Sequence, residues 1–255
     1  MDERIPSNCE RTLAELGFCV IKLPMEKRLS PAVASHTDML FFRHNNTLIT
    51  SQIYFREHSD LFEKIRSCLS LDIILADEAP GKDYPYDRIF NALVIGDKLF
   101  AKSEYLSGEI IKYSKDRGLK IIPVNQGYPA CVTLGAPGIA ITSDAGMART
   151  LKDEKVNVML IPDSEIILLP PYKFGFIGGC AGVLHSTVYF IGNLLSHPYG
   201  KRIEERLAKA GYSCVSLDPE SDSLFDMGGI FFFENPPKNT AVSGKNISPK
   251  ISKSV

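Results

Sequence analysis

The feature that most constrains the fold of this chain is the regular alternation of two kinds of segment. A hairpin-like pair of short apolar strands is followed by an amphipathic helix and one further strand, and this order recurs roughly every 40 to 60 residues. The expected helix-then-strand segments are 7–23, 59–75, 106–124, 144–161 and 198–217, and the hairpin-like segments are 36–51, 89–102, 130–142, 174–192 and 224–234. An additional strand is expected over 166–169, before two prolines.

The two ends of the chain carry complementary halves of the repeat. The chain begins with a helix and a strand and ends with a hairpin-like segment that shows one clear strand. Because stacked repeats bury their apolar faces only against neighbours, complementary ends indicate a closed ring. We therefore predict an α/β fold, a five-fold pseudosymmetric ββαβ propeller closed by its N- and C-terminal segments, within a single domain over 1–235.

Composition excludes several classes of protein. The formal net charge of -1 gives no basic field for nucleic acid, and the six cysteines form no Cys-x-x-Cys pair, so neither a metal site nor a disulfide framework is expected. The polar start and the lack of a run of about 20 apolar residues predict no secretion signal and no membrane span, and hence a cytoplasmic protein. The tail 236–255 has four lysines and no acid, which predicts a disordered, solubilising end.

The glycine-rich hairpin over 174–192 is the first candidate for a functional site. Gly178 and Gly179 directly precede Cys180. Glycine within a strand weakens it and usually marks the close approach of a backbone or a ligand. Cys180 is therefore either a thiol in open surroundings, and a candidate nucleophile, or a small hydrophobe in a tightly packed strand, the common fate of a free cysteine.

Other candidates are acidic, histidine and cysteine residues near strand starts. Each has a structural alternative. Asp38 could bond turn N–H groups, and His36 could lie on the surface. Cys131 is an equally plausible core cysteine and the second candidate for the nucleophile, after Cys180. Asp226 precedes a Gly-Gly pair that leaves room for a ligand, yet it could serve only to form a turn. Asp144, which precedes a helix, is expected to be an N-cap.

Three short motifs and the repeat architecture over residues 7–234 resemble the pentein fold of the guanidine-modifying superfamily. His36-Thr37-Asp38 is similar to the family's His-x-Asp, and Gly178-Gly179-Cys180 is similar to its glycine-preceded catalytic cysteine. The stretch 225–229, Phe-Asp-Met-Gly-Gly, is similar to its acidic, Gly-Gly-containing strand. The order of these motifs differs from that of the deiminases, which is consistent with an uncharacterised bacterial branch.

The resemblance implies a cysteine-dependent hydrolase or amidinotransferase acting on a small guanidine or amidine compound, with no metal and no organic cofactor. Cys180 would be the nucleophile and form a thiouronium-type intermediate, and His36 would be the general acid and base. Asp38 and Asp226 would hold the planar guanidinium. The residues expected to line the centre and contact the substrate are Asn91, Cys131, Gly179 and Gly228.

Two other functions compete with this interpretation. The same scaffold could be a non-catalytic binding protein, as in the superfamily's ribosome anti-association factors. A nucleotide-binding α/β enzyme is less favoured, because neither Gly-x-Gly-x-x-Gly nor a P-loop motif is present. The reactivity of Cys180 and the effect of nucleotides on thermal stability would separate these functions.

Overall fold

The computed structural model describes residues 1–234 and has a mixed α/β fold. Four three-stranded sheets share one topology, in which the first two strands form an antiparallel hairpin and the third pairs in parallel with the second. The sheets are β1 (Phe41–His44), β2 (Thr47–Ser51) and β3 (Asp72–Ala76); β4 (Leu93–Ile95), β5 (Lys98–Ala101) and β6 (Lys120–Pro123); β7 (Thr133–Ala136), β8 (Ile139–Thr142) and β9 (Asn157–Leu160); and β11 (Ala181–Leu184), β12 (Thr187–Phe190) and β13 (Ser213–Ser216). These four repeats confirm the predicted alternation.

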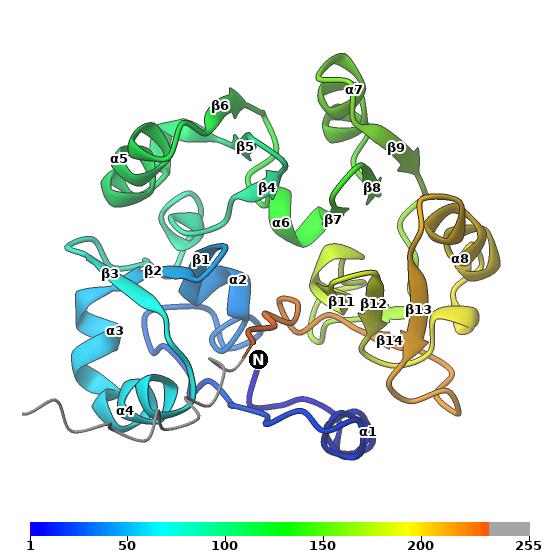
Figure 1. Ribbon diagram of the computed structural model, residues 1–255, viewed down its shortest axis with the longest axis horizontal. Helices are drawn as coiled ribbons and strands as arrows, with labels where there is room; N and C mark the ends of the chain where they lie inside the picture. The colour runs from blue at the N-terminus through cyan, green and yellow to red at the C-terminus, as the bar shows by residue number, and fades with distance from the viewer. Residues whose placement is uncertain (235–255) are drawn as a thin grey trace, which may run out of the picture.

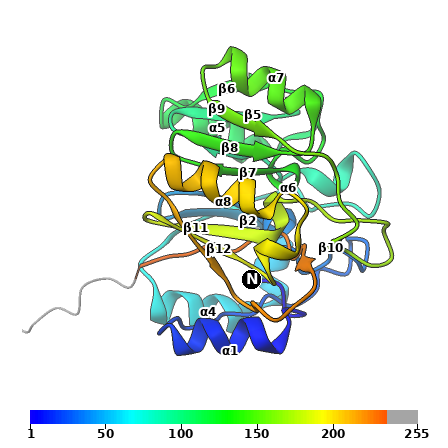
Figure 2. The same cartoon turned by 90° about the vertical axis from the view of Figure 1, so that its right-hand side faces the viewer.

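A helical connection joins the second and third strands of each three-stranded sheet, as a parallel pair requires. These helices are α3 (Gln52–Glu57) with α4 (Ser59–Cys68), α5 (Gly108–Asp116), α7 (Ala145–Asp153) and α8 (Gly200–Lys209). In α7 the Asp144 carboxylate accepts from the Met147 N–H at 2.6 Å, which confirms Asp144 as the N-cap. Figure 1 shows the four sheets arranged around the middle of the molecule, and Figure 2 shows α7, α8 and α1 (Ser7–Glu15) along its outer side.

The terminal segments pack together but do not form a fifth three-stranded sheet among residues 1–234. The strand expected over 18–23 is wrong: it contributes only one bridge, between Leu23 and Asp2. β14 (Leu224–Phe225) pairs in parallel with β10 (Ile167–Leu168), which confirms the additional strand expected near 166–169. One apolar cluster joins the two ends of the described chain, with Ile5, Cys9, Leu13, Leu217, Ile230 and Phe232. The five-fold symmetry of the ring therefore stays a prediction.

A short helical turn precedes the first strand of each three-stranded sheet and contributes buried residues. These turns are α2 (Thr37–Leu40), η1 (Tyr86–Arg88), α6 (Pro129–Val132) and η3 (Gly178–Cys180). They carry or adjoin most of the candidate site residues. Within residues 1–234 no helix is both long and apolar enough to cross a bilayer, and the tail predicted to be disordered lies outside the described residues.

Candidate functional site

The register of the hairpins shows which residues occupy equivalent positions. In three sheets the first strand opens with a pair at the same distance from the turn: Phe41–Thr50, Thr133–Thr142 and Ala181–Phe190. Two residues before these pairs lie Met39, Cys131 and Gly179, and one residue before them lie Leu40, Val132 and Cys180. Cys180 is thus equivalent to two buried apolar residues, whereas Cys131 shares its position with the glycine before Cys180.

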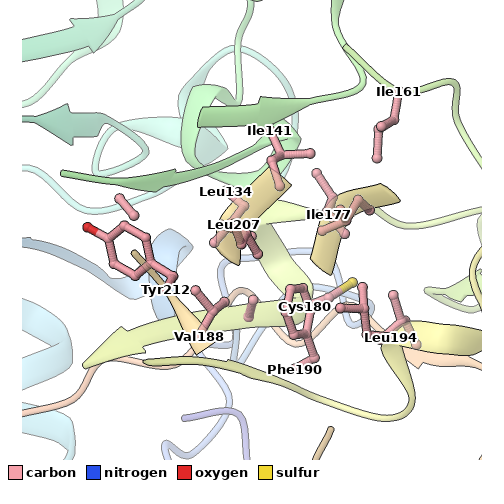
Figure 3. Close-up of a cluster of buried hydrophobic side chains, with 14 of the residues drawn as sticks. Leu134, Ile141, Ile161, Ile177, Cys180, Val188, Phe190, Leu194, Leu207 and Tyr212 are labelled. Atoms are coloured by element: carbon pink, nitrogen blue, oxygen red, sulfur yellow. The ribbon is translucent and has the colours of Figure 1, made fainter. Parts of the chain in front are cut away.

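Cys180 lies in an apolar cluster of the fourth sheet. Its side chain is fully buried among Ile177, Phe190 and Leu194 (Figure 3). Its thiol donates to the Phe176 carbonyl at 3.1 Å, and burial raises the pKa of the thiol, with Asp226 adding to the effect. Within residues 1–234 no hydrogen bond joins this sulfur to a histidine or a carboxylate. These surroundings favour the packing alternative for Cys180, because no side chain that could take up the thiol proton or orient the sulfur is hydrogen-bonded to it.

Cys131 instead belongs to a buried polar cluster drawn from three modules. Its thiol donates to Asp38 Oδ2 at 2.7 Å. Asn91 Nδ2 lies 3.1 Å from the same oxygen and 3.2 Å from the Cys131 sulfur, and Asn91 Oδ1 accepts from the Ala130 N–H at 3.0 Å. The structure therefore brings together the predicted residues Asp38, Asn91 and Cys131, with the amide of Asn91 fixing the carboxylate against the thiol.

Burial disfavours the charged forms of the acid and the thiol in this cluster. Burial raises the pKa of Asp38 to about 6, and the hydrogen bonds from Cys131 and Asn91 oppose that rise. Burial also raises the pKa of the Cys131 thiol, and the nearby carboxylates of Asp38 and Asp226 raise it further. A cation bound here would reverse both effects, since it stabilises a carboxylate and a thiolate together.

His36 is buried between two carboxylates, so the surface alternative for this residue is wrong. Its Nδ1 lies 3.8 Å from Asp226 Oδ1 and its Nε2 lies 3.8 Å from Asp2 Oδ2. Burial lowers the pKa of His36, whereas Asp226 and Asp2 act to raise it. The sequence did not predict Asp2 as a site residue, because no motif lies near it in the chain. In the structure, the Arg4 guanidinium donates to the Asp2 carboxylate at 2.6 Å and fixes its position.

Asp226 combines a turn-forming contact with a place in the site. Its carboxylate accepts from the N–H groups of Phe176 at 2.8 Å and of Gly228 at 3.1 Å, and burial raises its pKa. The predicted glycines make room for these acids. A Cβ at Gly179 would overlap the Asp226 carboxylate, and one at Gly228 would lie 2.6 Å from Asp38 Oδ1. The close approach predicted at Gly179 is therefore made by another part of the same chain.

A cavity of about 170 Å³ reaches the site between the first strands of the four sheets and the segment 228–231. Asp38, Ala130, Gly178 and Gly228 are among its lining residues. Asp38 Oδ1 has no hydrogen-bond partner within residues 1–234. A second, apolar cavity of about 190 Å³ lies beside 17–23 and 230–233, and neither the acids nor Cys131 line it. Asp38 lines the smaller cavity and not the larger one; Arg43 also lines the smaller cavity, whereas Cys131 and Asp226 are not among its lining residues.

The fold of this chain is similar to the pentein fold of several solved structures. An inosamine-phosphate amidinotransferase from Streptomyces griseus matches with a TM-score of 0.51 and 14% identity, over 89% of this chain and 79% of that chain. A cysteine-to-serine mutant of DDAH from Pseudomonas aeruginosa, in complex with citrulline, matches with a TM-score of 0.50 and 13% identity, over 85% of this chain and 84% of that one. At these identities the likeness establishes the fold alone.

The chain belongs to a family of unknown function, DUF6873, whose model matches residues 1–231. No curated protein matches the sequence. Among residues 1–234 there is no group of three or more histidine, cysteine, aspartate or glutamate side chains placed to hold a metal ion.

Replacing Asp38 by asparagine is expected to change how stability depends on pH. The pKa of Asp38 is about 6 in the folded chain and 3.8 is its ordinary value, so the folded state binds this proton more tightly. Its favourable contribution is present below about pH 4 and is lost as pH rises through 6, a change of up to about 3 kcal/mol. Urea unfolding from pH 4 to 8 should show wild type losing stability relative to Asp38→Asn over this window.

The exposed Asp116→Asn variant is the control, and its curve should run parallel to that of wild type. Parallel curves for wild type and Asp38→Asn would contradict the raised pKa of Asp38.

Proposed function

We propose that this chain is an enzyme acting on a guanidine or amidine compound through a covalent intermediate, and that Cys131 is its nucleophile. The observation that carries the proposal is the Cys131 thiol, 2.7 Å from the Asp38 carboxylate in a buried cluster. The pentein fold supports it, since the matched structures include an amidinotransferase and a dimethylarginine dimethylaminohydrolase. Cys180, the nucleophile favoured by the sequence, has the weaker case because it lies in an apolar core.

The acids give the proposed site its selectivity for a planar cation. Asp38 and Asp226 are both buried, and burial raises the pKa of each carboxyl. A guanidinium would pair with carboxylates through parallel N–H···O bonds and offset the cost of burying them. The incoming positive charge would also lower the pKa of Cys131, so the thiolate would form only when substrate is bound.

In the proposed reaction, Asp38 accepts the thiol proton as the Cys131 sulfur attacks the central carbon of the guanidinium. A C–S bond forms, and one C–N bond then breaks as His36 gives a proton to the leaving amine. In hydrolysis, water returns a proton to His36 and attacks the thiouronium carbon. The C–S bond breaks, the proton held by Asp38 returns to sulfur, and the hydroxyl proton of the urea-type product passes to the amine that left, which departs as an ammonium ion. In amidino transfer, an amine takes the place of water.

The experiment that tests this proposal is the capture of the covalent intermediate. The protein would be mixed with arginine, agmatine and N-methylated arginines, quenched in acid and digested, and the cysteine peptides would be weighed by mass spectrometry. We expect an adduct on the Cys131 peptide with at least one compound, absent in Cys131→Ser and retained in Cys180→Ser. An adduct on Cys180 would overturn the assignment of the nucleophile.

A non-catalytic binding protein is the second candidate function. The observation that favours it is the depth of the cluster, where Cys131 is 7% exposed and Asp38 4%. Such a cluster could serve only to specify the packing around the middle of the molecule. Absence of any adduct across the guanidine panel would overturn the enzyme and favour this alternative, and binding of a macromolecular partner would be sought next.

A further inference from the structure

The segment after α1 takes the place of a third strand, although it forms no strand in the described part of the chain. Gly17, with a φ of 88°, lies two residues past the end of α1, as Gly118 does past α5 and Gly211 past α8. After Gly118 and Gly211, the third strand of a sheet begins two residues later. Residues 19–23 also show the same order of exposed and buried positions as β9 and the residue that follows it. This segment is therefore equivalent to a third strand, and Figure 1 shows α1 between α4 and α8, where a fifth helix would lie.

Met1 takes the place of the last residue of a middle strand. In three sheets, the residue after the third strand donates its N–H to the carbonyl of the last residue of a four-residue middle strand. These pairs are Val124 with Ala101, Ile161 with Thr142, and Leu217 with Phe190. The Leu23 N–H donates in the same way to the Met1 carbonyl at 2.9 Å, and the Met1 amino group donates to the Ile21 carbonyl at 3.0 Å. Met1 is therefore equivalent to the fourth residue of a middle strand.

The apolar cavity of about 190 Å³ lies where the first three residues of that middle strand would be. In each three-stranded sheet the middle strand lies between the first and the third. Residues 230–231 line the smaller cavity together with the first strands of the other sheets, so 230–233 is equivalent to a first strand. The apolar cavity is lined by 17–21, by 230–233 and by Met1. These are the neighbours that the first three residues of a middle strand would have.

The backbone along this cavity has hydrogen-bonding groups available to an added strand. In the sheet of β4 to β6, the N–H of Lys120, the first residue of the third strand, donates to the Asp97 carbonyl at 2.8 Å. The equivalent N–H of Cys19 has no backbone partner within the described residues, and neither has that of Ile21. The N–H groups of 231–233 are also without a backbone partner in this part of the chain. Edges of this kind bind an extended peptide through main-chain hydrogen bonds.

We infer that this cavity binds the C-terminal segment of another protein as an added middle strand. Three extended residues would pair with 19–21 on one side and 231–233 on the other. The remaining lining is mostly apolar and includes Phe41, Leu48 and Ile65, so apolar side chains are favoured. A middle strand runs parallel to the third strand, so the bound segment would point its C-terminal end at Met1. Because Met1 closes that end of the cavity, the segment has to terminate there.

The Met1 amino group is complementary to the carboxylate that such a segment carries. Within the described residues its one hydrogen-bond acceptor is the Ile21 carbonyl, which leaves two N–H groups of the ammonium for a ligand. Burial lowers the pKa of this amino group to about 5, and the nearby Asp2 carboxylate is already paired with Arg4. An incoming carboxylate would stabilise the charged amine and raise that pKa. The cavity thus combines strand pairing with capture of a terminal carboxylate.

The peptide acetyl-Thr-Val-Tyr tests the inference on the full-length protein. It has the sequence of 187–189, the first three residues of the middle strand β12. With a free carboxylate it should raise the melting temperature and slow hydrogen exchange at the Cys19 and Ile21 amides. Its C-terminal amide, and a free acid N-methylated at valine, should each bind roughly 10-fold more weakly or worse. No binding, or equal binding of the three peptides, overturns the inference. Protection of these two amides before any peptide is added would show that the chain itself fills the cavity, and would also overturn it.

Two substitutions at one position separate strand pairing from simple burial of apolar side chains. Cys19→Pro removes the N–H group that faces the cavity, whereas Cys19→Ala keeps it at the same exposed position. The free acid should bind Cys19→Pro roughly 3- to 10-fold more weakly than Cys19→Ala, which should bind it as wild type does. Equal affinity of the two variants contradicts strand addition. If Cys19→Pro does not fold, the three peptides on wild type still decide the question, and none of these results depends on Cys131.

Discussion

A cationic alkylating reagent is expected to modify Cys131 far faster than a neutral reagent of the same shape. Chloroacetamidine carries a planar amidinium, whereas chloroacetamide is uncharged. In the free protein the Cys131 thiol is held protonated by burial and by two carboxylates, which raise its pKa. The amidinium would pair with those carboxylates and stabilise the thiolate beside the reactive carbon, and two paired hydrogen bonds of this kind correspond to a rate advantage of about 100-fold or more.

Variants separate the groups that produce this selectivity. Cys131→Ser should abolish the labelling, and Asp38→Asn, which removes the acceptor of the thiol proton, should slow it by about 10- to 100-fold. Cys180→Ser should react as wild type does. The exposed Cys19 is an internal control and should not favour the cationic reagent in this way. Equal rates for the two reagents at Cys131, or labelling of Cys180 first, would contradict the proposed site.

Replacing Gly179 by alanine is expected to destabilise the whole fold. The added Cβ would overlap the Asp226 carboxylate, which is anchored by the N–H groups of Phe176 and Gly228 and cannot move without breaking those bonds. Overpacking a rigid core costs about 1–3 kcal/mol, and displacing a buried acid from its partners adds to that, so we expect a loss of about 3 kcal/mol or more. The measurement is the free energy of unfolding in urea.

Gly211→Ala is the matched control for this substitution. Gly211 has a positive φ of 89° and nothing within 4 Å of an added Cβ. Its replacement should therefore cost only the backbone strain of about 1–2 kcal/mol. A Gly179→Ala protein as stable as Gly211→Ala would show that Asp226 can shift, and would contradict a fixed arrangement of acids around His36.

The four repeats could be predicted from sequence because each one carries its own pattern. Apolar alternation, a turn signal and an amphipathic helix are local features, and the observed hairpins follow them closely. The terminal module could not be predicted in the same way. Its segments come from opposite ends of the chain, and the apolar run 18–23 packs by its side chains without forming a strand.

The sequence also predicted which residues approach one another better than it predicted their roles. His36, Asp38, Asn91, Cys131 and Asp226 all lie in the buried polar region. The glycine pair marked a close approach, but the sequence does not show that η3 ends at Cys180 and not one residue earlier. Because neighbouring residues face opposite ways at a strand start, this difference of one residue places Cys180 in the core and Gly179 beside Asp226.

The contacts between 36–38 and 226–229 imply that the candidate site forms late in folding. The Asp38 N–H donates to the Gly228 carbonyl at 3.2 Å, and the Thr37 hydroxyl donates to the Gly229 carbonyl at 3.2 Å, across 192 positions of the chain for the latter pair. Contacts so distant in sequence form after local ones, because the loop entropy must be lost first. On a ribosome, His36 and Asp38 would emerge early and remain without Asp226 until the chain had been synthesised through residue 226.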